Sequence, residues 1–204
     1  MEFAYNNYLF VFYYNVLFFH MFFCCCNIYF YSVSLFCIFA LIDIKPGYFP
    51  IYEIMIFKNL NISKQILMAL EEAGLEEPTP IQEQAFAVIR SGKDMVGIAQ
   101  TGTGKTLAYL IPVLMKLHYA QGSYPRALVV VPTRELVVQV CESVELLTEY
   151  MDIRCVGIYG GTNIRTQQAA VYEGVDLLVA TPGRFMDIYM NGIIRTSQIK
   201  TVVV

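Results

Sequence analysis

The feature that most constrains the fold is a glycine-rich segment placed between an apolar strand and an apolar helix. It runs from Ala99 to Thr106 and reads Ala-Gln-Thr-Gly-Thr-Gly-Lys-Thr. The residues before it, Met95–Ala99, predict a short strand, and residues 105–118 predict a partly buried helix. Gly102 and Gly104 allow backbone angles that a Cβ atom disfavours, so successive N–H groups can converge on phosphate oxygens. The segment therefore predicts a strand, loop and helix that together bind a nucleotide phosphate.

The two side chains that close this segment, Lys105 and Thr106, are the candidate catalytic residues. In such loops the lysine reaches the β- and γ-phosphates, the hydroxyl joins the Mg²⁺ shell, and the helix directs its positive N-terminus at the anion. Ala99 stands where the usual pattern has its first glycine. A glycine-rich turn without a ligand is the weaker alternative, because Gly-Lys-Thr after an apolar strand seldom arises by chance.

Composition divides the chain near Met55. Of the 15 Tyr and 14 Phe residues, 19 lie in residues 1–54, where the formal charges are Glu2, Asp43, Lys45 and Glu53. Residues 55–204 carry 13 Lys and Arg against 14 Asp and Glu, so a nucleic-acid contact there needs a local basic patch. We predict a hydrophobic, aromatic-rich extension over 1–54 and one domain over 55–204. The spacing of the six cysteines favours neither a metal site nor a disulfide.

The extension has more than one interpretation. Residues 3–42 carry no formal charge, and this uncharged segment is longer than the ~20 apolar residues needed to span a bilayer. Asn15, His20 and the scarcity of Leu count against a spanning helix, and Glu2 counts against a secretory signal. We favour an AT-rich upstream region read in frame, with Met55 as the natural start. The expected location is then cytoplasmic; a genuine membrane segment would instead attach the protein through residues 3–42.

Beyond Met55, predicted helices alternate with apolar strands. The strand runs are continuously apolar, as in strands buried on both faces, which predicts an α/β fold with a parallel sheet between helices. Predicted strands are Met95–Ala99, Ala127–Val131, Arg154–Ile158, Asp176–Ala180 and Thr201–Val204. Predicted helices span Ser63–Ala73 and Thr79–Gly92, the latter with a capping box formed by Thr79 and Gln82, and then 105–118, 134–150, 164–172 and 185–191.

Three further polar loops each follow a predicted strand. They are Pro132–Leu136, Gly160–Thr162 and Thr181–Arg184. Taken singly, each is explained by a capping threonine or a plain turn. The carboxyl ends of parallel strands meet at one edge of a sheet, so together the loops can offer N–H groups, hydroxyls and arginines to a second polyanion. Contacts of this kind read backbone shape and charge, not base identity.

The order and spacing of these segments resemble the DEAD-box RNA helicases. The resemblance covers residues 56–204 and rests on Phe57, Gly74–Gln82, Ala99–Thr106, Pro132–Leu136 with Gln139, Gly160-Gly161 and Thr181–Arg184. The sequences of these motifs are most similar to those of the bacterial RhlE-type branch. The resemblance implies a RecA-like P-loop NTPase domain, an enzyme that couples ATP hydrolysis to RNA unwinding, ATP and Mg²⁺ as cofactors, and a monomer.

The resemblance also assigns roles to residues. It implies that Gln82 reads the adenine edge with help from Thr79 and Phe57, while Leu75 stands where the family often has an aromatic residue. The implied ATP-binding residues are Phe57, Thr79, Gln82, Ala99, Gln100, Thr101, Gly102, Thr103, Gly104, Lys105 and Thr106, with Thr106 as the metal ligand. The implied contacts to the RNA sugar-phosphate backbone are Pro132, Thr133, Arg134, Gly161, Thr181 and Arg184.

One expected motif is not among the 204 residues. In the family, the strand that corresponds to Thr201–Val204 runs into Asp-Glu-Ala-Asp, whose carboxylates hold Mg²⁺ through water and position the attacking water. We therefore expect this fragment neither to hydrolyse ATP appreciably nor to unwind RNA. The alternative function is an inactive nucleotide-binding module, tethered to a membrane if residues 1–54 are genuine.

Overall fold

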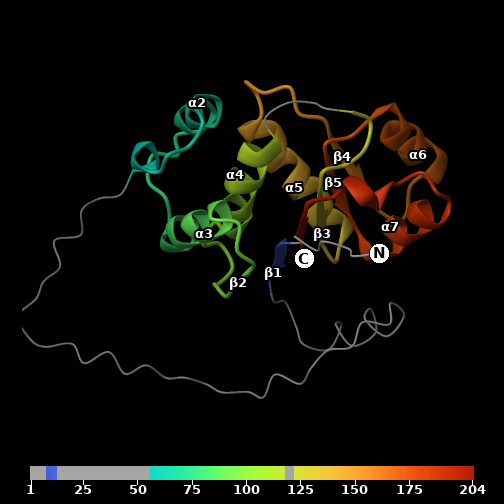
Figure 1. The fold of residues 1–204 in the computed structure, drawn as a ribbon, viewed down its shortest axis with the longest axis horizontal. Coiled ribbons are helices and arrows are strands. Elements are labelled where there is room, and N and C mark those ends of the chain that lie inside the picture. The colour runs from blue at the N-terminus through green and yellow to red at the C-terminus, as the bar shows by residue number, and fades with distance from the viewer. Residues whose placement is uncertain (1–7, 13–55, 118–121) are drawn as a thin grey trace, which may run out of the picture. The chain divides into compact units, whose positions relative to one another are not determined.

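The computed structural model describes residues 8–12, 56–117 and 122–204 and confirms the predicted α/β class (Figure 1). The strands are β1 Tyr8–Phe12, β2 Met95–Gly97, β3 Ala127–Val130, β4 Cys155–Ile158, β5 Leu177–Ala180 and β6 Thr201–Val203. The helices are α2 Lys64–Glu72, α3 Pro80–Arg90, α4 Lys105–Leu117, α5 Arg134–Leu147, α6 Ile164–Glu173 and α7 Pro182–Met190. Short 3₁₀ turns, η1 Phe57–Asn59 and η2 Thr196–Gln198, complete the described elements.

The described strands form one parallel sheet in the order β2-β1-β6-β3-β5-β4. In the pairing of β3 with β5, Ala127 lies opposite Leu177 and Val130 lies opposite Ala180. Because the strands are parallel, β2, β3, β4 and β5 all lead into their following loops at the same edge of the sheet. β3, β5 and β4 are neighbours, whereas β1 and β6 lie between β2 and β3. The strand order therefore decides which loops become neighbours.

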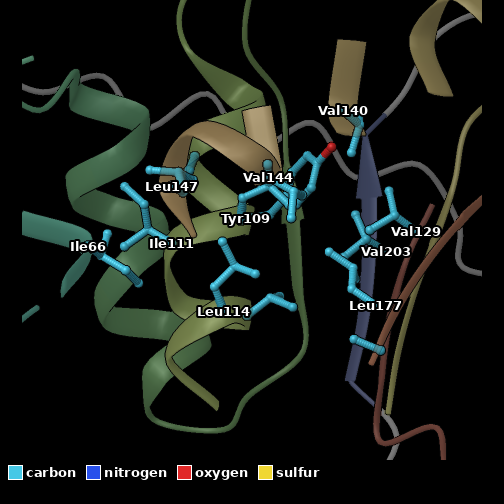
Figure 2. Packing of buried hydrophobic residues seen from close by; sticks show 14 of the residues in the cluster. Ile66, Tyr109, Ile111, Leu114, Val129, Val140, Val144, Leu147, Leu177 and Val203 are labelled. Atoms are coloured by element: carbon cyan, nitrogen blue, oxygen red, sulfur yellow. The ribbon is translucent and has the colours of Figure 1, made fainter. Parts of the chain in front are cut away.

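Alternate side chains of the strands enter two separate cores, one on each face of the sheet. Ala127 and Val129 of β3 pack with the cluster of α2 to α5, while Leu128 between them packs with the cluster of α6 and α7. Figure 2 shows the first of these cores, in which Val129, Leu177 and Val203 of the sheet face Tyr109 and Leu114 of α4. Burial on both faces is the physical reason for the continuously apolar strand sequences.

The predicted helices are present, with boundaries that follow their caps. α7 begins at Pro182, three residues earlier than predicted, because Thr181 is its N-cap and proline suits the first helical position. α5 ends at Leu147 instead of residue 150, where the N–H and hydroxyl of Thr148 both donate to the Val144 carbonyl. β2 ends at Gly97, since its pairing with β1 covers only Met95–Gly97. Helix capping and strand pairing thus set the element boundaries that the hydrophobic periodicity of the sequence does not define.

A buried carboxylate joins the residues that precede three neighbouring strands. The side chain of Asp176, before β5, is fully buried and pairs with Arg126 before β3 at 3.1 Å and with Arg154 before β4 at 3.0 Å. The Arg154 backbone N–H also donates to this carboxylate at 3.1 Å. Burial alone would raise the pKa of Asp176, but the hydrogen bonds and charges of Arg154 and the charge of Arg126 hold it below its ordinary value.

The strand β1 comes from the segment predicted as an N-terminal extension. It lies between β2 and β6 in the sheet, with Phe10 opposite both Met95 and Val203. The remainder of the predicted segment 3–42 lies outside the described residues. Among the residues that the structure describes, no helix combines the length and apolar character that crossing a bilayer requires.

Candidate nucleotide and nucleic-acid site

The glycine-rich segment forms a loop between β2 and α4, as predicted. Within this phosphate loop (Ala99–Gly104), Gly102 and Gly104 have φ angles of 81° and 80°, in the left-handed region that favours glycine. Lys105 is the first residue of α4, and Thr106 is the second. The loop therefore presents its backbone at a helix N-terminus, which is the arrangement that binds phosphate oxygens.

The ammonium group of Lys105 lies inside the phosphate loop. Its Nζ atom donates to the carbonyl of Ala99 at 2.7 Å and to that of Gln100 at 3.0 Å. The Thr103 hydroxyl donates to the same Gln100 carbonyl at 2.8 Å. These bonds hold the positive charge within the phosphate loop, and in loops of this kind the lysine reaches the β- and γ-phosphates of a nucleotide.

The candidate metal ligand Thr106 has a neighbour that sequence reasoning did not single out, Tyr109, one helical turn further along α4. Burial raises the pKa of Tyr109, and its interaction with the Thr106 side chain opposes that rise. The described residues contain no group of three His, Cys, Asp or Glu side chains that could hold a metal ion. In phosphate loops a hydroxyl at this position joins the Mg²⁺ shell, and phosphate oxygens and water supply other ligands, so Thr106 fits that role.

The start of α3 is hydrogen-bonded to the phosphate loop. Gln82 is 5% exposed, and its amide accepts from the Thr79 N–H at 2.9 Å and donates to the Gly104 carbonyl at 3.1 Å. The Thr79 hydroxyl donates to the Thr103 carbonyl at 2.9 Å, so this side chain is hydrogen-bonded to the phosphate loop. Two residues predicted to recognise adenine are therefore joined directly to the residues predicted to bind phosphate.

Phe57 occupies a different position from Gln82 and Thr79. Its side chain is 3% exposed, belongs to the core formed by α2 to α5, and borders a cavity of about 270 Å³ that Leu67, Leu70 and Leu75 also line. The Phe57 N–H donates to the Glu76 carbonyl at 3.0 Å, which fixes η1 against the segment that leads to Thr79. Neither Gln82 nor the phosphate loop lines this cavity.

The three further polar loops follow β3, β4 and β5 and are therefore adjacent at the carboxyl edge. Thr133 caps α5 and accepts from the Leu136 N–H at 3.3 Å, and Arg134 begins the helix with an exposed side chain. Pro132 is also exposed, and Gly161 has a φ of 83°. Thr181 occupies the N-cap position of α7 without a capping hydrogen bond from its side chain, and its N–H donates to the Ile158 carbonyl of β4. The capping bond expected of Thr133 is thus observed and that of Thr181 is not, while the N-termini of both helices face this edge.

The arginines of the first and last of these loops have different environments. The Arg134 guanidinium lies over the ring of Tyr159, 5.1 Å from its centroid. The Arg184 side chain is only 10% exposed and donates to the Thr162 carbonyl at 3.1 Å and to the Gln167 amide oxygen at 2.8 Å. Tyr159 and Gln167 were not among the predicted site residues, because neither belongs to a motif and only the folded strand order brings them beside the arginines.

The phosphate loop and the other three loops lie at the same edge of the sheet, but the strand before the phosphate loop is not a neighbour of the other three strands. Three strand spacings separate β2 from β3, which is about 14 Å. This separation suits two different anionic ligands, one at the phosphate loop and one at the loops after β3, β5 and β4.

Comparison with known proteins agrees with this arrangement. The sequence profile of the DEAD/DEAH box helicases matches residues 79–204. The chain is 39% identical over 145 residues to the ATP-dependent RNA helicase DBP2 of Encephalitozoon cuniculi, covering 69% of this chain and 29% of that protein. It is 41% identical over 151 residues to the ATP-dependent RNA helicase RhlB of Pasteurella multocida, covering 72% and 36%.

Among solved structures, a DEAD box protein from Methanococcus jannaschii has the same fold. Its TM-score is 0.68 at 32% identity, with 73% of this chain and 41% of that chain covered. The present chain therefore spans only about a third of the length of the two curated relatives.

Proposed function

Because this chain belongs to the DEAD/DEAH box helicases, we propose that it is the ATP-binding and RNA-binding part of an ATP-dependent RNA helicase. The observation that carries the proposal is the shared carboxyl edge of the sheet. There the phosphate loop follows β2, and three strand positions away the other three loops follow the neighbouring strands β3, β5 and β4. This placement supports two separate anion-binding surfaces. The parent enzyme would couple ATP hydrolysis at the first surface to the movement of RNA bound at the second.

At the first surface, the residues present fit ATP with Mg²⁺. Lys105 would hold the β- and γ-phosphates, the N–H groups of Gly102 to Lys105 would bind phosphate oxygens, and Thr106 would be the protein ligand of the metal. Mg²⁺, when bound, would neutralise charge on the phosphates. Gln82 and Thr79 would select adenine while bonded to Gly104 and Thr103, so nucleotide identity and phosphate-loop geometry would be coupled.

At the second surface, the ligand would be the sugar-phosphate backbone of RNA. Arg134 supplies an exposed charge beside the capped N-terminus of α5, and Thr181 and Gly161 supply polar and backbone groups at the adjacent loops. These groups favour phosphate and ribose and carry no pattern that distinguishes bases. We therefore propose binding that does not depend on sequence, by a monomer.

Hydrolysis needs carboxylates beside the metal ion. The sequence contains no Asp-Glu-Ala-Asp, and the described residues hold no acidic cluster beside Thr106. We propose that the 204-residue chain binds ATP without appreciable turnover. The relatives named above as ATP-dependent RNA helicases do not favour the alternative of a module whose parent protein is inactive.

The proposal is tested by nucleotide binding to the 204-residue chain. A fluorescent ATP analogue with Mg²⁺ should bind the unaltered chain, and Lys105→Ala should weaken that binding at least tenfold, because it removes the charge held in the loop. Lys200→Ala is the matched control, since it removes a lysine from the segment that precedes β6. Equal affinity of the unaltered chain and Lys105→Ala, or phosphate release at the rate of a complete helicase, would contradict the proposal.

A further inference from the structure

The side chain of Gln167, in the first half of α6, makes three hydrogen bonds between separate loops. Its Nε2 atom donates to the Tyr159 carbonyl at 3.2 Å and to the Thr162 hydroxyl at 2.7 Å. Its Oε1 atom accepts from Arg184 at 2.8 Å. Only an amide has both a donor and an acceptor at these positions, because a carboxylate cannot donate to the Tyr159 carbonyl.

Arg184 completes the connection from the other side. One of its terminal nitrogens binds Gln167 and the other binds the Thr162 carbonyl, while its Nε atom lies 3.9 Å from Asp187. With 10% of its side chain exposed, the guanidinium is directed at the protein and has little surface left for a ligand. Arg134, by contrast, is exposed, and its guanidinium contacts these loops by lying over the ring of Tyr159.

These contacts connect all three loops at the carboxyl edge. Tyr159 has Arg134 of the first loop over its ring, and its carbonyl accepts from Gln167. Thr162 of the second loop binds Gln167 through its hydroxyl and Arg184 through its carbonyl, and Arg184 belongs to the third loop. We call Tyr159, Thr162, Gln167 and Arg184 the loop brace.

We propose that Gln167 is a positioning residue for RNA, which holds the loops after β3, β4 and β5 as one surface through the loop brace. The inference rests on the proposed function, since it concerns how the second surface takes a sugar-phosphate backbone. In this arrangement Arg134 contacts the RNA directly. Arg184 acts through Gln167 and the Thr162 carbonyl, and it stabilises the loop instead of binding a phosphate.

The test measures two affinities of the full 204-residue chain at one fixed salt concentration. A fluorescein-labelled single-stranded oligouridylate probes the second surface by anisotropy, and the fluorescent ATP analogue with Mg²⁺ probes the first. Gln167→Met keeps the length of the side chain and removes all three hydrogen bonds, so RNA affinity should fall about tenfold while ATP-analogue affinity stays within twofold. Gln168→Met, the same change at the next residue of α6, should leave both affinities unchanged.

A double-mutant cycle separates positioning from a general loss of structure. If Gln167 acts through the loops that include Arg134, Arg134→Ala combined with Gln167→Met should lose less RNA affinity than the product of the two single losses. Gln167→Glu is a second variant, which keeps a partner for Arg184 but cannot donate to the Tyr159 carbonyl, and it too should lose RNA affinity. The effects of Arg134→Ala and Gln167→Met multiplying independently would overturn the inference.

The outcomes also separate this inference from the function on which it rests. If the unaltered chain binds the oligouridylate and both Gln167 variants bind it equally well, the inference is overturned and the proposed function stands. If the unaltered chain does not bind the oligouridylate at all, the RNA part of the proposed function is wrong and the inference fails with it.

Discussion

At the scale of the residue, Gly104 has the most demanding position in the phosphate loop. Its φ is 80°, and a Cβ atom there would overlap the amide nitrogen of Gln82. Gly102 has the same backbone requirement with a φ of 81°, but a Cβ atom there would meet nothing within 4 Å. The two glycines therefore separate the cost of backbone strain from the cost of a close contact.

This contrast predicts different effects of the same substitution. Gly102→Ala should cost about 1–2 kcal/mol of backbone strain, while Gly104→Ala should add the loss of the Gln82 contact and weaken ATP-analogue binding by at least a further tenfold. Titration with the fluorescent ATP analogue measures the loss of nucleotide affinity, and denaturant unfolding measures the cost of backbone strain as a change in the free energy of unfolding. Equal nucleotide affinities of the two variants would show that the Gln82 bond to Gly104 has no part in binding.

At the scale of the element, the buried carboxylate of Asp176 ties together the starts of three neighbouring strands. Asp176→Asn would leave Arg126 and Arg154 partly buried beside a neutral amide, so we expect the free energy of unfolding to fall by about 3 kcal/mol at pH 7. Denaturant unfolding measures it. Asp152→Asn is the control, because Asp152 is exposed and lies in the same segment.

The interaction of Asp176 with the two arginines also predicts how the free energy of unfolding depends on pH. The pKa of Asp176 is lowered in the folded protein, so its stabilisation is complete above the ordinary aspartate value of about 3.9 and is lost as pH falls through the lower folded value. The difference in unfolding free energy between the unaltered chain and Asp176→Asn should therefore shrink below about pH 4. A difference that stays constant from pH 7 to pH 3 would be inconsistent with this assignment.

At the scale of the whole molecule, the strand β1 joins the nucleotide-binding part of the sheet to the remainder. It pairs with β2 on one side and with β6 on the other, and in this register Phe10 lies opposite Met95 of β2 and Val203 of β6. Proline lacks the N–H that a central strand donates, and Phe10→Pro should lower the free energy of unfolding by about 3 kcal/mol and weaken nucleotide binding through β2. Phe10→Val, which keeps the N–H, should have a much smaller effect on both. Equal stability of the proline and valine variants would show that β1 is not part of the sheet in solution.

Much of this fold could be predicted because its signals are local. Thr79, Thr133 and Thr181 occupy N-cap positions that the residues around them already indicate, and Pro80 and Pro182 follow two of them. The apolar strands after Met55 are predictable for a similar reason, since burial on both faces leaves an uninterrupted apolar run. β1 was not predicted, because a five-residue apolar strand within a long apolar segment has no local boundary.

The candidate site was predictable only where its residues form motifs. Lys105 and Thr106 directly follow the loop that the glycines indicate, whereas Gln167 lies in a helix with no motif and is hydrogen-bonded to Arg184, 17 residues away. The bond between Gln82 and Gly104 joins residues 22 apart, and nothing in either segment alone implies it.

Short segments of the sequence are enough to specify the parallel α/β class, the phosphate loop and the family, because capping, glycine conformation and apolar runs are local properties. The folded chain is needed to make β3, β5 and β4 neighbours, to turn Arg184 into the protein while Arg134 is exposed, and to connect their loops through Gln167. These features follow from strand order, which sets which loops are neighbours and depends on packing between segments distant in the chain.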